Sequence, residues 1–200
     1  MYVPKSFAVE DRAVLVEFIK REPFGILVSS IVGKPFATHV PFIIETGGES
    51  LRLALHVAKA NPQWQNIEGQ DVLAIFNGPH AMVSAGWYAD PEHTVPTWNY
   101  SAVHCSGTAR LTDAAGTRRI IEKLVAQFEP AWRIDQAEPD YIEQMERAIV
   151  GIEIDVTRVD VKFKYSQNRT PEDRERVMNA LASSSRPMDR QVSDEMRLLR

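Results

Sequence analysis

Hydrophobic and polar positions alternate along several short stretches of the chain. The clearest stretch is residues 103–111, where Val103, Cys105, Gly107, Ala109 and Leu111 share one side of the pattern. Alternation with a period of two predicts a strand that has one buried face, and turn residues between such strands predict hairpins. Further strands are predicted at 25–31, 35–44, 51–56, 71–77, 81–85 and 151–165.

Apolar residues at helical spacing mark a smaller part of the chain. Helices are predicted over 11–20, between Asp113 and Pro130, and over 139–148, with a short helix that begins at Asn61-Pro62. Six or seven mostly antiparallel strands with peripheral helices indicate a mainly β fold, a small closed or split β-barrel.

The chain changes character near Arg169. Residues 171–200 are polar, and Val177, Met178 and Leu181 form only a modest apolar stripe before a break at 183–187. We therefore predict a barrel domain over 1–170, followed by a C-terminal helix and a mobile tail over 171–200.

Composition and charge narrow the class of protein. The chain is 44% hydrophobic and 25% charged, with a net charge of −4, which favours a soluble globular domain over a non-specific nucleic-acid binder. A single cysteine excludes an intrachain disulfide, and its strand position favours a buried, inert thiol. The chain shows neither a membrane-length apolar run nor a signal-peptide pattern, so a cytoplasmic protein is expected.

Two stretches could hold a polar or anionic ligand. A predicted strand delivers Lys59 to the helix start at Asn61, where free N–H groups and the ammonium favour a phosphate monoester. Residues 163–169 gather side-chain donors where the last strand ends, and these suit a phosphate, ribityl hydroxyls or a ring edge. The alternatives are a surface lysine beside a well-capped helix, which spacing alone favours, and an ordinary polar strand end.

Four aromatic residues flank the loop before the clearest strand: Trp87, Tyr88, Trp98 and Tyr100. Such rings can stack on a planar heterocycle or form the core of a dimer interface, and the two roles are compatible. The five histidines lack the spacing of a metal site, and no nucleophile elbow, Walker loop or dinucleotide-binding glycine motif is present. Hydrolase chemistry therefore has no support in the sequence.

Several motifs that occur together in one order resemble the PaiB-like family, over nearly the whole chain to Leu181. They are Met1-Tyr2-Val3-Pro4, His39-Val40-Pro41-Phe42, the run from His56 to Gln63, Phe76-Asn77-Gly78-Pro79-His80, Trp87-Tyr88, Val95-Pro96-Thr97-Trp98-Asn99-Tyr100 and Lys164-Tyr165-Ser166-Gln167-Asn168-Arg169.

This resemblance implies an FMN-binding split barrel like that of pyridoxamine-phosphate oxidases, forming a homodimer with the flavin in a groove between subunits. It implies that His39 and Val40 line the isoalloxazine edge. Lys59 and Asn61 would take the phosphate, and Trp98 with Asn99 would approach from the clearest strand. The other cofactor-binding residues implied are His56, Lys164, Ser166, Gln167 and Asn168.

Three functions compete at this point. The family is described as FMN-binding negative transcriptional regulators, so the first interpretation is a flavin-binding repressor that is not an enzyme. DNA would then be a partner, although the acidic charge and the lack of a helix-turn-helix pattern argue against direct contact. The alternatives are an FMN-dependent oxidoreductase and a flavin-free split-barrel dimer.

Overall fold

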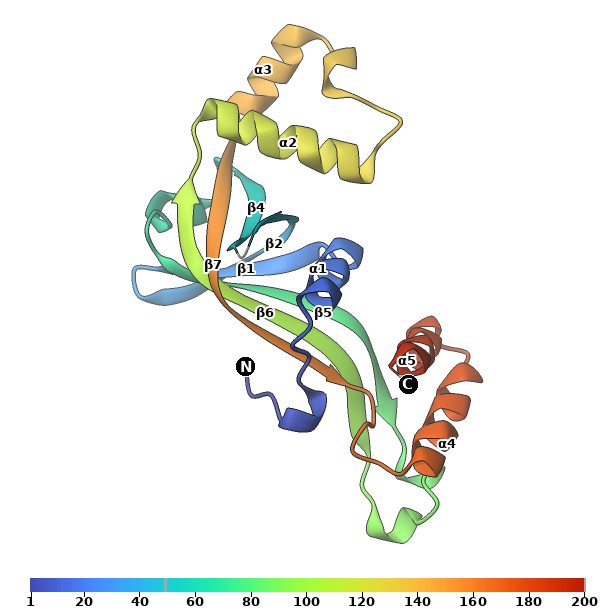
Figure 1. Ribbon diagram of the computed structural model, residues 1–200. Coiled ribbons are helices and arrows are strands. Elements are labelled where there is room, and N and C mark those ends of the chain that lie inside the picture. The colour runs from blue at the N-terminus through green and yellow to red at the C-terminus, as the bar shows by residue number, and fades with distance from the viewer. Residues whose placement is uncertain (49, 200) are drawn as a thin grey trace. The chain divides into compact units, whose positions relative to one another are not determined.

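The computed structural model describes residues 1–48 and 50–199, and their contacts divide the chain into two compact units (Figure 1). Unit 1 comprises Met1–Leu15, Asn77–Val103 and Asp160–Arg200, and unit 2 comprises Val16–Phe76 and His104–Val159. The elements are η1 (Lys5–Phe7), α1 (Arg12–Arg21), β1 (Phe24–Ile31), β2 (Lys34–Pro41), β3 (Ile43–Gly47), β4 (Ser50–Ala58), η2 (Pro62–Asn66), β5 (Asp71–Val83), η3 (Ala85–Trp87), η4 (Pro91–His93), β6 (Thr97–Leu111), α2 (Ala114–Phe128), η5 (Ile134–Gln136), α3 (Pro139–Arg147), β7 (Ile149–Lys164), α4 (Pro171–Ala182) and α5 (Pro187–Leu198).

Unit 2 contains the barrel. The strand order of the sheet is β2-β1-β5-β6-β7-β4-β3, so that β2 and β3 stand at opposite ends of the order. Only Phe42 separates the last residue of β2 from the first residue of β3. Because one residue spans less than about 4 Å, the two edges of the sheet must lie next to each other. The sheet therefore curls into a barrel, as predicted.

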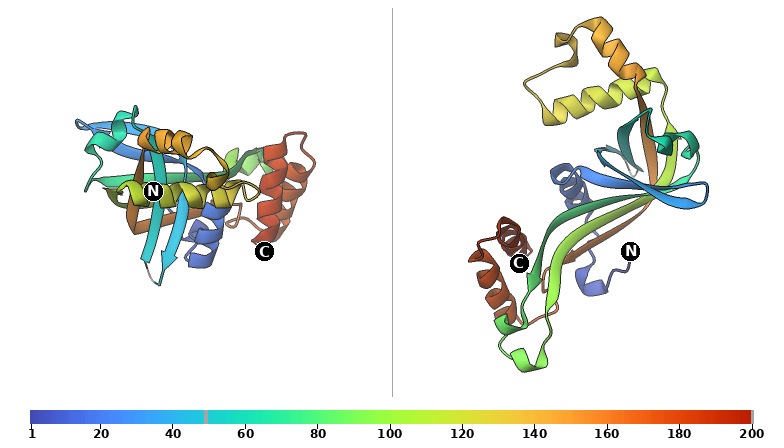
Figure 2. Two further views of the ribbon diagram at one scale, coloured as in Figure 1. Left: turned by 90° about the horizontal axis from the view of Figure 1, so that it is seen from above. Right: turned by 180° about the vertical axis from the view of Figure 1, so that it is seen from behind.

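The β1–β2 hairpin shows how the sequence fixes one barrel corner. Val32 and Gly33 both have positive φ, at 50° and 75°. This pair of angles is the two-residue type I′ turn, whose twist matches that of the flanking strands. The register that follows pairs Ile31 with Lys34 and Phe24 with Pro41, and the hairpin is visible in both views of Figure 2. The predicted hairpin is confirmed.

Close backbone approach fixes a second part of unit 2. A Cβ added to Gly107 would lie 2.3 Å from the carbonyl oxygen of Asp155, so only glycine fits on β6 at this point. The neighbouring Cys105 is fully buried, and burial raises the pKa of its thiol to about 12. The prediction of a buried thiol is confirmed.

The two helices of unit 2 differ in how they pack. Ile120 and Leu124 of α2 join Ile43 and Ala54 in one buried apolar cluster. No residue of α3 is buried, and Figure 2 shows α3 following α2 at one end of the unit.

The observed strand boundaries correct two predictions. The strand expected over 35–44 is divided at Phe42, and the two strands expected at 71–77 and 81–85 are one strand, β5, which runs through Gly78-Pro79. The fixed φ of proline is compatible with extended backbone.

Unit 1 ends in a packed helical pair where we expected one helix and a tail. The hydroxyl of Thr170 caps α4 by accepting from the N–H of Asp173 at 3.2 Å, and Pro171 follows at the first helical position. On α5, Val192 and Met196 are fully buried, and the Ser193 hydroxyl donates to the Met178 carbonyl at 2.9 Å. This apolar face was not recognised in the sequence because most residues of 187–198 are polar. Among the described residues, no helix has the length and apolarity needed to cross a membrane.

Candidate functional site

Two of the predicted cofactor-binding residues lie side by side on β2 in unit 2. His39 is exposed, and its ring stacks on that of Phe24 with 6.3 Å between centroids and 28° between planes. Val40 is buried. The imidazole of β2 and the phenyl ring of Phe24 on β1 therefore face solvent, whereas Val40 packs in the barrel core.

Asn61 acts within the backbone framework. Its side-chain oxygen accepts from the N–H of Gln63 at 2.9 Å, as predicted for a helix cap, and its amide donates to the Thr38 hydroxyl at 2.9 Å. Both ends of the amide are thus used by neighbouring residues. The element that it caps is η2, a five-residue 3₁₀ helix.

Lys59 lies in mixed electrostatic surroundings. The side chain is exposed at the end of β4 and borders a cavity of about 440 Å³ that also contacts Glu143, Glu146 and Arg147. Arg147 pairs with Glu143 at 2.5 Å. Carboxylates near an ammonium offset its attraction for an anion. This environment gives Lys59 no clear preference for a phosphate.

His56 lies on β4 opposite Gly151 of β7. Its Nδ1 is buried and has no hydrogen-bond partner among the described residues. Burial lowers the pKa of the imidazole, because desolvation disfavours the charged form. We therefore expect His56 to be neutral at pH 7.

In unit 1, a buried polar network contains two more predicted residues. Asn99 of β6 is fully buried and donates to the Ser166 hydroxyl at 3.0 Å and to the Met196 sulfur at 3.6 Å. The Tyr165 hydroxyl donates to that of Ser101 at 2.8 Å. These groups bind one another, so the network ties β6, the end of β7 and α5 together within the unit.

The end of β7 forms a tight turn. Ser166 has a φ of 63°, a left-handed conformation that is uncommon for residues other than glycine. Gln167 accepts from the Tyr165 N–H at 2.6 Å and donates to the Phe163 carbonyl at 2.5 Å. The Gln167 amide therefore shapes the turn, whereas Asn168 remains exposed.

Trp98 and Asn168 are the exposed predicted residues of unit 1, whereas Lys164 is half-buried. Trp98 is 48% exposed, and its ring lies 6.0 Å from that of His80 at a tilt of 41°. Lys164 donates to the Thr97 hydroxyl at 2.5 Å. Burial, then repulsion from Lys162 and Arg169, lowers the pKa of Lys164.

The structure thus divides the predicted residues between the two units. His39, Val40, His56, Lys59 and Asn61 belong to unit 2, and Trp98, Asn99, Lys164, Ser166, Gln167 and Asn168 belong to unit 1. The sequence prediction missed two neighbours in unit 1, Lys162 and His80, and it counted Arg169 among the donors of 163–169 without including it in the cofactor-binding set. Strand alternation was the available signal for Lys162, because residues two apart share a face.

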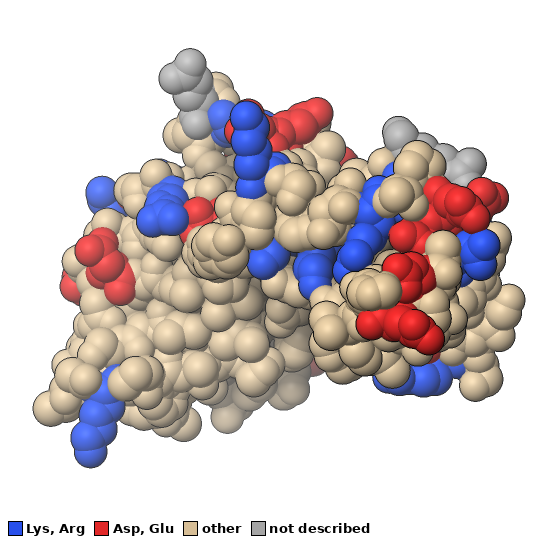
Figure 3. All heavy atoms as spheres, turned by 90° about the horizontal axis from the view of Figure 1, so that it is seen from below, with Lys and Arg blue, Asp and Glu red and all other residues tan. Residues whose placement is uncertain are grey.

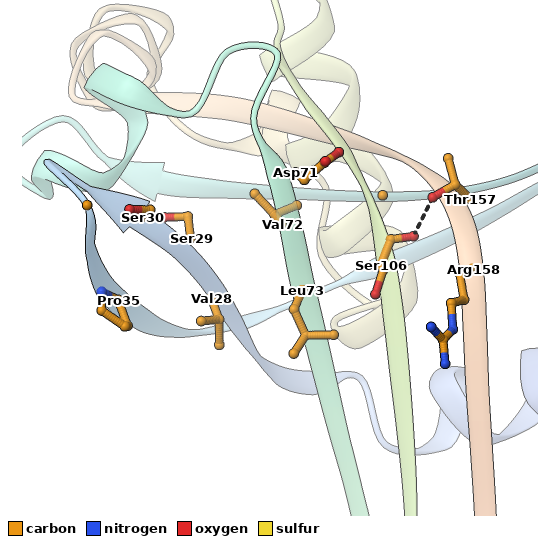
Figure 4. Close-up of a pocket in the computed structure, with 12 residues that line it drawn as sticks. Val28, Ser29, Ser30, Pro35, Asp71, Val72, Leu73, Ser106, Thr157 and Arg158 are labelled. Carbon is orange, nitrogen blue, oxygen red and sulfur yellow. Dashed lines mark hydrogen bonds between the residues drawn. The ribbon is translucent and has the colours of Figure 1, made fainter. Parts of the chain in front are cut away.

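A larger cavity in unit 2 contains none of the predicted residues. It has a volume of about 580 Å³, within the range of small-molecule sites. Figure 4 shows its wall, where the Thr157 hydroxyl donates to the Ser106 carbonyl at 3.3 Å and Leu73 and Val28 add apolar surface. The cavity offers hydroxyl groups, aliphatic carbon, the Asp71 carboxylate and the Arg158 guanidinium, and none of its described lining residues carries an aromatic ring.

Comparison with known proteins identifies the class. With solved structures the chain shares the fold of flavin-binding split barrels: the flavocytochrome Anf3 of Azotobacter vinelandii is 19% identical, with a TM-score of 0.62 over 82% of this chain and 72% of that one. The FAD- and heme-binding protein of Mycobacterium smegmatis is 15% identical, with a TM-score of 0.60 over 78% of this chain and 72% of that one.

The sequence comparisons define the family. Residues 1–158 match the family described as "Putative FMN-binding domain". The Bacillus subtilis protease synthase and sporulation protein PAI 2 is 33% identical over 98% of this chain and 96% of its own length. An uncharacterized protein of Emericella nidulans is 29% identical over 90% of this chain and 89% of its own. The chain belongs to this PaiB-like, FMN-binding family, and FMN is the cofactor that its membership supports.

Proposed function

We propose that this protein is a PaiB-type negative transcriptional regulator whose split barrel binds FMN. The observation that carries the proposal is the match of residues 1–158 to the FMN-binding family together with the similarity to the B. subtilis protein along nearly the whole chain. The name of that relative connects it with protease synthesis and sporulation.

The residues present suit a phosphorylated flavin. A flavin site needs ring faces for the isoalloxazine and positive charge for the phosphate. The exposed Trp98 ring beside His80 supplies a ring face in unit 1, and the stacked Phe24 and His39 supply another in unit 2. Lys164 supplies an ammonium group in unit 1. Bound FMN would supply redox chemistry, and side chains of one unit, such as Trp98 and Lys164, would hold and orient it.

We further propose that the protein acts as a homodimer. The α2–α3 region presents apolar side chains to solvent, since Phe128, Trp132, Tyr141 and Met145 are 37–57% exposed. Interfaces between subunits are enriched in aromatic residues and methionine. Light scattering after size-exclusion chromatography would give twice the 22.6 kDa chain mass, and a monomer at micromolar concentration would contradict the proposal.

The absorbance of the purified protein tests the flavin part of the proposal. We expect a yellow protein with a band near ~450 nm, which belongs to the flavin itself. Reconstitution with FMN should restore the band after its removal. Failure to bind added FMN would overturn this part. Bleaching of the band by reduced nicotinamide without oxygen would favour the oxidoreductase alternative.

A gel-shift titration tests the mode of regulation. The face in Figure 3 shows some Lys and Arg side chains gathered near its middle with Asp and Glu side chains beside them, and the chain carries a net charge of −4. Direct DNA binding through phosphate contacts weakens steeply as salt rises. We expect no such salt-dependent binding, and hence regulation through a partner. A specific complex that dissociates with added salt would show direct action instead.

A further inference from the structure

Three cationic side chains lie close together in unit 1. Lys162 and Lys164 are two residues apart on β7, so they share one face of the strand. The tight turn after β7 brings Arg169 back, because its N–H donates to the Ser166 carbonyl at 3.0 Å. Repulsion from both neighbours contributes to the lowered pKa of Lys164, which places the three charges within electrostatic reach.

Lys162 and Arg169 contact neutral groups. The Lys162 ammonium donates to the Tyr2 carbonyl at 3.3 Å and lies 5.6 Å from the Tyr2 ring and 5.4 Å from the Tyr100 ring. The Arg169 guanidinium lies 4.6 Å from the Tyr88 ring centre. Ring faces stabilise cations without neutralising them.

Carboxylates are missing from this set of contacts. Within residues 1–48 and 50–199, the structure records no ion pair for Lys162, Lys164 or Arg169. Asp160, two residues before Lys162, contacts the amino group of Met1 instead. Lys162 is only 9% exposed, so its charge is largely withdrawn from water. Buried charge is unfavourable unless a counter-charge accompanies it.

From this arrangement we propose that Lys162, Lys164 and Arg169 form an anion site that binds a phosphate monoester. A guanidinium binds two phosphate oxygens at once, and ammonium groups add point charges. The cluster lies outside residues 1–158, which match the FMN-binding domain, and Lys164 and Arg169 stand in one of the motifs that resemble the PaiB-like family. The exposed ring of Trp98 on the same unit suits a phosphate ester that carries a planar group.

The same reasoning disfavours Lys59 as the phosphate-binding lysine. Lys59 shares its cavity with Glu143 and Glu146, whereas Lys164 has two cationic neighbours. The phosphate can belong to FMN, in which case this inference rests on the proposed function, or to a second small molecule. The chemistry of the site is the same in both cases, and the two sources are separated by experiment.

Calorimetric titration of the full-length, flavin-free protein with inorganic phosphate tests the site directly. We expect one site in the wild type, and a loss of affinity of about tenfold or more in Lys164→Met and in Arg169→Gln, because each removes a charged hydrogen-bond donor. Lys5→Met, at an exposed lysine of the same unit, is the matched control and should bind as the wild type does. Undetectable binding to the wild type, or equal affinity in all four proteins, would overturn the proposal.

FMN and riboflavin, which differ only in the phosphate, identify its source. If FMN supplies the phosphate, the preference for FMN over riboflavin falls about tenfold in Lys164→Met but not in Lys59→Met. If a second molecule supplies it, inorganic phosphate still binds the FMN-loaded protein and the preference stays unchanged. A preference lost only in Lys59→Met, with no phosphate binding to the FMN-loaded protein, would refute the site. Failure of both flavins to bind would refute the proposed function alone, since the phosphate titration stands without them.

Discussion

Cations on and beside the strands have different partners in the two units of this protein. In unit 2, Arg52 pairs with Glu153 and Asp155 at 3.3 and 3.0 Å. Other pairs follow the same pattern in that unit, including Arg118 with Glu146, Arg119 with Glu153 and Lys123 with Glu45. In unit 1, the cluster of Lys162, Lys164 and Arg169 lacks such partners among the described residues.

The two units also differ in the side chains that they bury. The barrel strand β4 in unit 2 buries Leu53, Leu55 and Val57, and Gly107 lets two strands approach closely. Unit 1 buries polar side chains such as Asn99 and Ser166. A scaffold gains stability from apolar packing and paired charge, whereas unpaired charge costs stability and marks a place for a ligand. The difference therefore locates the anion site in unit 1.

The largest effect is expected where backbones approach in unit 2. Gly107→Ala should lower the free energy of unfolding by about 3 kcal/mol or more, because the methyl group would overlap the Asp155 carbonyl. Denaturant unfolding measures the change. Gly86→Ala is the control, since its Cβ would lie 3.6 Å from the nearest atom, and it should be nearly neutral. Equal stability of the two variants would contradict the close approach.

The polar interior of unit 1 should give the next effect. Asn99→Leu should lower the free energy of unfolding by about 2 kcal/mol, because it removes the amide that binds the Ser166 hydroxyl in a buried place. The same unfolding measurement applies, with the exposed Asn168→Ala as control. If Asn99→Leu proves as stable as the wild type, the network is not needed for unit 1 to fold.

The lowered pKa of His56, a residue of unit 2, predicts that the stability of the protein depends on pH. The pKa of His56 in the folded state lies below the usual value of 6.5. As the pH falls, His56 is therefore protonated in the unfolded chain before it is protonated in the folded protein. The free energy of unfolding should therefore fall as the pH drops below 6.5 toward the folded pKa. His56→Gln should flatten this slope, and His80→Gln should keep it. An unchanged slope in His56→Gln would assign the effect to other groups.

The smallest change in the free energy of unfolding is expected when one cation of each unit is replaced. Arg52→Gln removes two partly exposed ion pairs and should cost less than about 1 kcal/mol. Lys164→Met, without phosphate present, should not lower stability, because it relieves repulsion from Lys162 and Arg169. Unfolding of both variants at low salt makes the comparison. A larger loss in Lys164→Met than in Arg52→Gln would remove the distinction between the units.

The sequence by itself determined the strands, most of the helices and the fold class. These features depend on residues that are neighbours in the sequence, so a short stretch of sequence is enough to predict them. Examples are the alternation over 103–111, the turn at Val32-Gly33 and the cap at Asn61. The resemblance to one family rested on motifs that are equally local. The polar stretch 187–198 was predicted to be a tail, whereas it forms the helix α5. Its burial depends on the packing of α5 against α4, which the local sequence does not show.

Only the tertiary structure decided what each candidate residue contacts. It assigned Asn99, Ser166 and Gln167 to buried or turn-forming hydrogen bonds and left Lys164 beside two other cations. It also gave Lys59 acidic neighbours from a segment more than eighty residues away. The physical reason is that electrostatic energy and burial depend on distance in space, which the order of residues along a chain does not specify.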